Sequence, residues 1–170
     1  MPIPRPAGLV ARLHRLLPAT LMALAALPCV PASAGPVEAR VRAAGAMRVC
    51  IWPDYVGITW RHPQTRELSG IDIDLSAELG RDLKLKVEYV DSSFATLIPD
   101  LLGDRCDVAM FAVGRLPQRM EHLRFTRPYL ASDIYGITTK GSRVVRFWDD
   151  IDKPGVQVAV QAGTFMEPVM

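Results

Sequence analysis

Residues 70–90 read GIDIDLSAELGRDLKLKVEYV, and this stretch decides the fold. Gly70 permits a tight turn, and an apolar residue then recurs at every fourth position, which is the spacing of one helix face. The residues of this ridge are Ile71, Leu75, Leu79 and Leu83. From Leu83 to Tyr89, apolar and charged residues alternate, as is typical of a partly solvated strand. The stretch therefore predicts a helix that is followed directly by a strand.

The segments on either side repeat this order. Residues 47–51 form a short apolar run that predicts a buried strand, and residues 57–70 indicate an irregular hairpin. Residues 92–103 carry apolar positions at helical spacing, although Pro99 requires a kink or a restart there. Residues 107–113 predict another buried strand. The order strand, helix, strand, helix, strand predicts a parallel α/β sheet with right-handed crossovers.

Shorter elements are predicted on both sides of this core. Pro117 suits the first position of a short helix that runs to His122. Residues 147–151 indicate a second short helix, and residues 156–160 a further strand. Residues 35–46 are small and charged, and we expect a mobile lead-in there.

The N-terminus has the pattern of an export signal. Residues 1–34 contain three arginines and no acidic residue, then an apolar run, then Ala32-Ser33-Ala34, which predicts a signal peptide cleaved after Ala34. The run is too short to span a membrane, although Cys29 leaves a lipid anchor open as an alternative. Without this leader the net charge of +2 becomes slightly negative. Basic charge is therefore no argument for nucleic-acid binding.

Cys50 and Cys106 remain after cleavage. An exported pair permits a disulfide, but bridging needs Cα atoms within about 7 Å. Both residues are predicted on neighbouring strands and offset along them, so we expect two buried thiols, with a bridge as the alternative. The three histidines are isolated in the sequence, so we expect neither a metal site nor a cofactor.

Residues 70–83 resemble the signature of the bacterial solute-binding proteins of family 3. Residues 107–110, 125–129 and 156–164 resemble later parts of the same family in the same order. The resemblance implies a periplasmic-binding-protein-like (type II) α/β fold with two lobes that close on a ligand. Lobe 1 would span residues 47–135 and the second lobe would start within residues 136–170. Family members are longer, so we expect a chain cut short in lobe 2: a fragment, a degraded gene product or an incomplete gene model.

The function implied by this resemblance is binding without catalysis. The chain would be a periplasmic monomer, not membrane-spanning once the leader is removed, that delivers a small solute such as an amino acid to an ABC transporter permease. Three alternatives stay open: an exported cyclohexadienyl dehydratase-like enzyme, a detached sensor domain and a non-functional truncated remnant.

Ligands of parallel sheets bind beyond the carboxyl ends of the strands, and the candidate binding residues follow them. The resemblance assigns the ligand carboxylate to Arg119, because a guanidinium makes two parallel bonds to a carboxylate. It places Tyr55 and Phe94 in the cleft and gives Thr164 a ligand bond from lobe 2.

The remaining candidates depart from the family pattern. Trp52 stands where the family frequently has an acid, and Asp54 is the nearby carboxylate that could replace it. Ala112 and Gly114 stand where hydroxyls are common, so only their backbone groups could bind. Asp72 and Asp74 do not face each other on a helix, and we expect solvated acids there rather than a catalytic pair.

Overall fold

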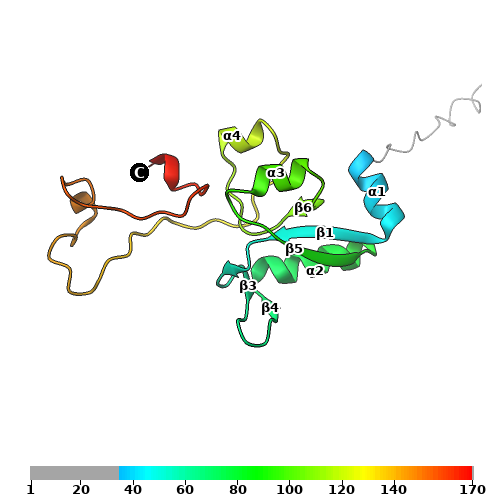
Figure 1. Cartoon of the computed structure of the whole chain (residues 1–170), viewed down its shortest axis with the longest axis horizontal. Coiled ribbons are helices and arrows are strands. Elements are labelled where there is room, and N and C mark those ends of the chain that lie inside the picture. Colours follow the sequence, from blue (N-terminus) through cyan, green and yellow to red (C-terminus); the bar gives the residue numbers. More distant parts are fainter. Residues whose placement is uncertain (1–34, 170) are drawn as a thin grey trace, which may run out of the picture. The chain divides into compact units, whose positions relative to one another are not determined.

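The computed structural model of the protein describes residues 35–169, so the predicted signal peptide lies outside the described residues. Its central sheet has three parallel strands, with β1 (Ala46–Ile51) between β5 (Lys86–Asp91) and β6 (Val108–Ala109) (Figure 1). The predicted parallel α/β sheet is therefore confirmed. The chain passes from β1 to β5 on one side and returns to β6 on the other. This order creates a topological switch point beside β1, where such sheets bind ligands.

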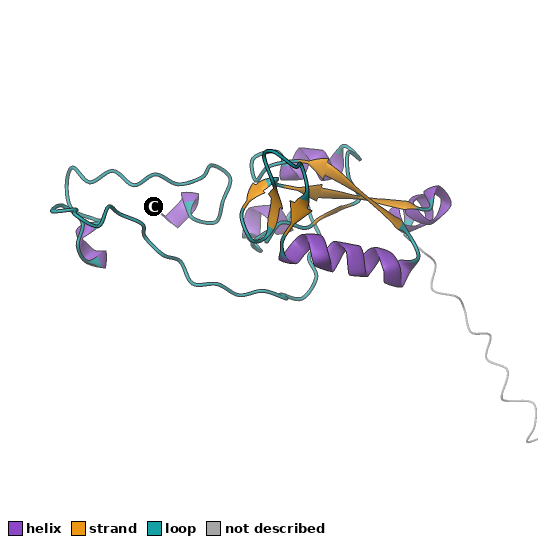
Figure 2. Ribbon diagram, turned by 90° about the horizontal axis from the view of Figure 1, so that it is seen from below, coloured by secondary structure: helices purple, strands orange, loops and turns teal. Residues whose placement is uncertain are grey.

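Helices cover both faces of this sheet, because successive side chains of a strand point to opposite faces. Met47, Val49 and Ile51 of β1 belong to one buried cluster with Ile73 of α2 (Ile71–Leu83), which runs along the strands (Figure 2). Cys50 belongs instead to a second cluster with Leu97 of α3 (Leu97–Leu102). The result is an α/β/α layering around β1.

The buried face of α2 differs from the predicted apolar ridge. Ile71 and Leu75 are 45% and 40% exposed, whereas Ser76 and Gly80 are buried. A Cβ added to Gly80 would lie 2.5 Å from Cγ2 of Val87 in β5. The helix therefore turns Ser76 and Gly80 inward, and the close approach of Gly80 to β5 decides its rotation.

The predicted hairpin is confirmed as an antiparallel sheet of β2 (Asp54–Tyr55), β3 (Thr59–Arg61) and β4 (Leu68–Ser69). Thr59 is fully buried, and its hydroxyl donates to the carbonyl of Trp52 at 2.6 Å. The amide of Arg61 donates to the carbonyl of Pro53 at 2.8 Å. The hairpin therefore fixes the loop that follows β1.

One helix was not predicted, and another begins later than predicted. The expected mobile lead-in contains α1 (Pro36–Ala44), with proline in its first turn, buried Val41 and Gly45 closing it at φ 64°. Further along the chain, α3 begins only at Leu97, because the Ser93 hydroxyl accepts from the amide of Thr96 at 3.2 Å and forms a turn instead.

The chain between β6 and the next helix is less regular than predicted. β6 has two residues rather than the expected strand over 107–113, because Ala112 takes a φ of 51° and its amide bonds outside the sheet. The predicted short helix after this bend is confirmed as α4 (Pro117–Met120).

The region predicted to begin a second lobe contains the 3₁₀ helices η1 (Trp148–Asp150) and η2 (Glu167–Val169). η1 matches the predicted short helix, and its Asp150 carboxylate accepts from the amides of Arg146 and Phe147. The strand predicted at 156–160 is wrong, because no described segment hydrogen-bonds beside it as a sheet neighbour. Over residues 35–169, no helix has the length and apolar character needed to cross a membrane.

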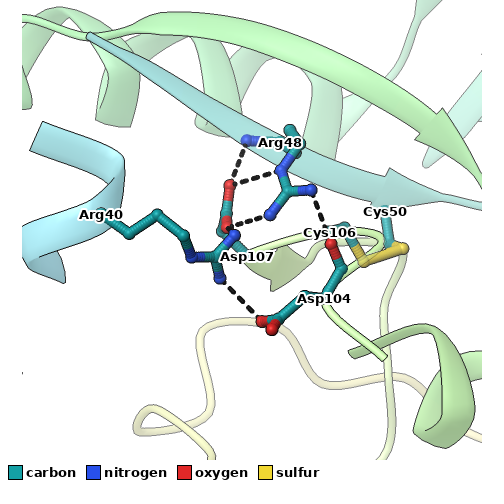
Figure 3. A network of polar contacts seen from close by, with 6 residues as sticks. All are labelled: Arg40, Arg48, Cys50, Asp104, Cys106 and Asp107. Carbon is teal, nitrogen blue, oxygen red and sulfur yellow. Dashed lines mark hydrogen bonds and ion pairs between the residues drawn. A yellow bond between two sulfur atoms is a disulfide. The ribbon is translucent and has the colours of Figure 1, made fainter. Parts of the chain in front are cut away.

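Cys50 and Cys106 form a disulfide with Cα atoms 5.6 Å apart, which corrects the expectation of two thiols (Figure 3). The expectation failed because Cys106 lies before β6 rather than on it. Asp104, at φ 57°, turns the chain there and brings Cys106 back beside β1.

A polar network lies next to this disulfide (Figure 3). The Asp107 side chain, 4% exposed, accepts from the amide and Nη2 of Arg48, both at 2.8 Å, and from Nη1 of Arg40 at 3.0 Å. Burial alone would raise the pKa of Asp107, but the hydrogen bonds from Arg48 outweigh it and hold that pKa below its usual range. The network therefore joins α1, β1 and the entry to β6 around a charged aspartate.

Candidate functional site

Three aromatic side chains meet beyond the carboxyl ends of the strands. The ring centroid of Trp52, after β1, lies 5.4 Å from that of Tyr55 and 5.4 Å from that of Phe94, which follows β5. The rings of Tyr55 and Phe94 are 6.1 Å apart and meet edge to face. These three residues are called the aromatic cluster below, and tilted and edge-to-face contacts are the arrangements that such rings prefer.

Arg119 enters the same region from α4. It is 4% exposed, and its guanidinium carbon lies 5.6 Å from the ring centroid of Phe94, within the range of a cation–π interaction. Nη1 donates to the carbonyl of Gly114 at 2.8 Å, and Nη2 donates to the carbonyl of Gly163. Burial lowers the pKa of Arg119.

The charge of Arg119 has no acidic partner within residues 35–169. Both of its hydrogen-bond acceptors are main-chain carbonyls, and no ion pair among the described residues includes it. A buried charge is costly unless it is paired. This arrangement suits the capture of an anion, and a guanidinium matches the geometry of a carboxylate.

The backbone of the loop after β6 is already committed within the protein. The amide of Ala112 donates to Asp72 at 2.6 Å, and the carbonyl of Gly114 accepts from Arg119. Through these bonds, Ala112 ties the loop to Asp72, and Gly114 holds the side chain of Arg119.

Thr164 and Asp54 differ in placement. Thr164 is 6% exposed, and its hydroxyl donates to the carbonyl of Gln161 at 2.6 Å. Its neighbour Gly163 has φ 75°, and an added Cβ would lie 2.8 Å from the carbonyl of Phe94, so only glycine fits there.

Asp54 is exposed in β2 and stays outside the groove that the other seven candidates line. Those seven are Trp52, Tyr55, Phe94, Ala112, Gly114, Arg119 and Thr164.

Asp72 was misjudged from the sequence. Asp74 is exposed as expected, but Asp72 is fully buried. Its Oδ1 accepts from the hydroxyl of Tyr129 at 2.7 Å and its Oδ2 from the amide of Ala112. One feature of the sequence could have indicated this role: Asp72 stands at the start of a helix that begins near the carboxyl edge of the sheet.

The chain resembles known proteins over most of the described residues. The family model described as bacterial extracellular solute-binding proteins, family 3, matches residues 47–164. A cyclohexadienyl dehydratase of Pseudomonas aeruginosa is 31% identical over 126 residues, which are 73% of this chain and 46% of that protein. A probable histidine-binding protein of Campylobacter jejuni is 26% identical over 121 residues, which are 71% of this chain and 46% of that protein. The chain thus spans about half the length of these relatives.

Solved structures show the same likeness. An ancestral amino acid-binding protein, a precursor of cyclohexadienyl dehydratase, matches with a TM-score of 0.69 and 28% identity, over 77% of this chain and 58% of that chain. The arginine-bound form of domain 1 from TmArgBP matches with a TM-score of 0.50 and 27% identity, over 53% of this chain and 71% of that chain.

Proposed function

The chain belongs to the bacterial extracellular solute-binding proteins of family 3, and from that premise we propose that it binds an amino acid for delivery to an ABC transporter permease. The observation that carries this proposal is the buried guanidinium of Arg119, whose described acceptors are only carbonyl oxygens. A ligand carboxylate would supply the missing negative charge.

The aromatic cluster supports an apolar or aromatic ligand side chain. Trp52, Tyr55 and Phe94 offer ring edges and faces to such a side chain. Phe94 already has a cation against its ring in Arg119. A second positive charge placed there would be repelled by the first.

Two relatives support the binding of an amino acid by a region of this size. The structure of TmArgBP domain 1 is an arginine-bound form, and this chain covers 71% of it. The ancestral protein that matches over 77% of this chain is described as amino acid-binding. Lobe 1 is therefore the part of the chain to which we assign ligand capture.

A second candidate function is favoured by one specific likeness. The 31% identical relative is a cyclohexadienyl dehydratase, and such an elimination needs a positioned general acid. His122 lines the groove but is exposed. We therefore rank binding above catalysis.

The test is calorimetric titration of the purified chain with L-phenylalanine, L-histidine and L-arginine. We expect L-phenylalanine to bind most tightly, and Arg119→Met to weaken it by about 100-fold, the effect of removing one partner of a buried charge pair. Arg119→Lys should recover part of the loss, because it restores the charge without the fork. Arg81→Met, which removes an exposed arginine of α2, is the matched control and should leave affinity unchanged.

Two results would contradict the proposal: no binding of any of the three amino acids, or equal affinity in wild type and Arg119→Met. Incubation with prephenate or arogenate tests the second candidate. Release of product would show that the protein is an enzyme, and the proposal of binding without catalysis would be wrong.

A further inference from the structure

Asp72 has no part in the proposed binding chemistry, yet it is the most enclosed acid near the site. Its side chain is fully buried. Each carboxylate oxygen has a donor, with Tyr129 on Oδ1 at 2.7 Å and the amide of Ala112 on Oδ2 at 2.6 Å. Asp72 does not line the groove that Arg119 lines, and both of its oxygens are already bonded, so we assign its role to its two donors.

The backbone that carries Asp72 is itself held in place. The amides of Ile71 and Asp72 donate to the carbonyls of Gly57 and Ile58, at 3.0 and 3.1 Å. Gly70 has φ 128°, and a Cβ there would collide with the Ile58 carbonyl. The hairpin therefore fixes the start of α2, and with it the position of the carboxylate.

One donor belongs to the loop that supports the ligand arginine. Ala112 takes a φ of 51°, which is unfavourable for a residue with a Cβ and persists only where surrounding contacts enforce it. Two residues later, the carbonyl of Gly114 accepts from Nη1 of Arg119. Asp72 thus holds the backbone bend that presents this carbonyl to the arginine.

The other donor belongs to the segment that follows α4 toward residue 136. Tyr129 is 52% exposed as a residue, but its hydroxyl donates to Asp72. Burial, followed by the bond to Asp72, raises the pKa of Tyr129, so the phenol keeps its proton and remains a donor at neutral pH.

We propose that Asp72 is a positioning residue that holds the loop 112–114 and the segment at Tyr129 as one unit, so that the support of Arg119 and the path of the chain leaving lobe 1 are coupled. The effect on ligand affinity rests on the proposed function, whereas the coupling between the two segments does not. Either segment, when loosened, should loosen the other.

The test removes only the phenolic hydroxyl. In Tyr129→Phe the bond between Asp72 and the amide of Ala112 is left in place, so a change at Ala112 reports coupling through the carboxylate. We expect amide hydrogen exchange at Ala112, measured by NMR on the full chain, to accelerate about fivefold, and affinity for L-phenylalanine to fall by about the same factor, the lower end of coupling between sites. Amides 49–51 of β1 should keep their exchange rates.

Tyr135→Phe is the matched control, because Tyr135 is 78% exposed and its loss should change neither exchange nor affinity. Unchanged exchange at Ala112 in Tyr129→Phe would overturn the proposal. Equal acceleration at Ala112 and across β1 would also overturn it, because that is the pattern of general destabilisation. Accelerated exchange at Ala112 alone, in a chain that binds none of the amino acids tested, would support the coupling and refute the proposed binding function.

A second variant changes the carboxylate itself. Asp72→Asn keeps one acceptor oxygen for two donors, so one of the two bonds is lost, and by the proposed coupling both segments should loosen. Asp74→Asn on the exposed face should loosen neither. If Asp72→Asn does not fold, the Tyr129→Phe result decides.

Discussion

Two arginines at different places around the sheet differ in their partners, because Arg48 pairs with an acid and Arg119 with main-chain carbonyls. Arg48, in β1, pairs with the buried carboxylate of Asp107, and that hydrogen bond raises the pKa of Arg48 (Figure 3). Arg119, beyond the carboxyl ends, is 4% exposed and donates to carbonyl oxygens, and burial lowers its pKa. The first charge is paired with an acid within the fold, whereas the second has only carbonyl acceptors among residues 35–169 and is the one that we propose to bind an external anion.

The largest expected effect concerns the disulfide that lies between these two regions. Cys50 lies in a buried cluster with Leu97, and Phe94 packs against that cluster. Cys106 directly precedes Asp107 in the sequence. The bridge joins residues 56 positions apart. Replacing both cysteines by alanine should lower the free energy of unfolding by about 4 kcal/mol, because the unfolded chain regains the entropy of an open loop. Urea unfolding of both proteins measures this difference.

Dithiothreitol provides the control for this prediction. It should destabilise the wild type toward the level of the double variant and leave the double variant unchanged. A double variant as stable as the oxidised wild type would show that the bridge does not stabilise the fold.

The next prediction contrasts the two arginines directly. Asp107→Asn leaves Arg48 without its carboxylate, whereas Arg40 keeps its pair with Asp104. The change should cost about 2 kcal/mol, less than for a fully buried pair because both arginines are partly exposed. Arg119→Met removes a buried charge that lacks an acidic partner among residues 35–169, so stability should change by less than about 0.5 kcal/mol or rise, although affinity falls by about 100-fold. Urea unfolding tests both variants, and a loss of stability in Arg119→Met equal to that in Asp107→Asn would erase the distinction.

The sequence predicted the parallel sheet and the placement of the candidate residues after its strands, because both depend on local patterns. The apolar run at 47–51 and the helical spacing after Gly70 are properties of short segments. Residues placed after strands by this reading include Trp52, Phe94 and Arg119, and the structure brings their side chains together. The parallel order β5-β1-β6 then places the ends of the strands at one edge.

The features that the sequence did not predict depend on contacts between distant segments. Asp72 looked like a solvated acid because the donors that bury it come from residues 40 and 57 positions later. Cys106 looked like a strand residue because the bend at Asp104 has no clear local signal. The rotation of α2 follows from the fit of Gly80 against Val87. Each is decided by tertiary packing, which overrides local pattern.

The smallest expected effect is the fall in the free energy of unfolding at acid pH. Hydrogen bonds from Arg61 hold the pKa of Asp91 below its usual range, and those from Arg48 do so for Asp107 against the opposing effect of burial. A carboxylate with a lowered folded pKa stabilises the fold above its unfolded value, about 3.9, and that contribution is lost as pH falls through the folded pKa. The free energy of unfolding should therefore be level between about pH 5 and 7 and decline below about pH 4. Asp107→Asn should show a shallower decline and the exposed Asp74→Asn the full one, in urea unfolding at several pH values. An identical slope in Asp107→Asn and wild type would show that the pair with Arg48 does not stabilise the charged aspartate, and the contrast with Arg119 would lose its electrostatic basis.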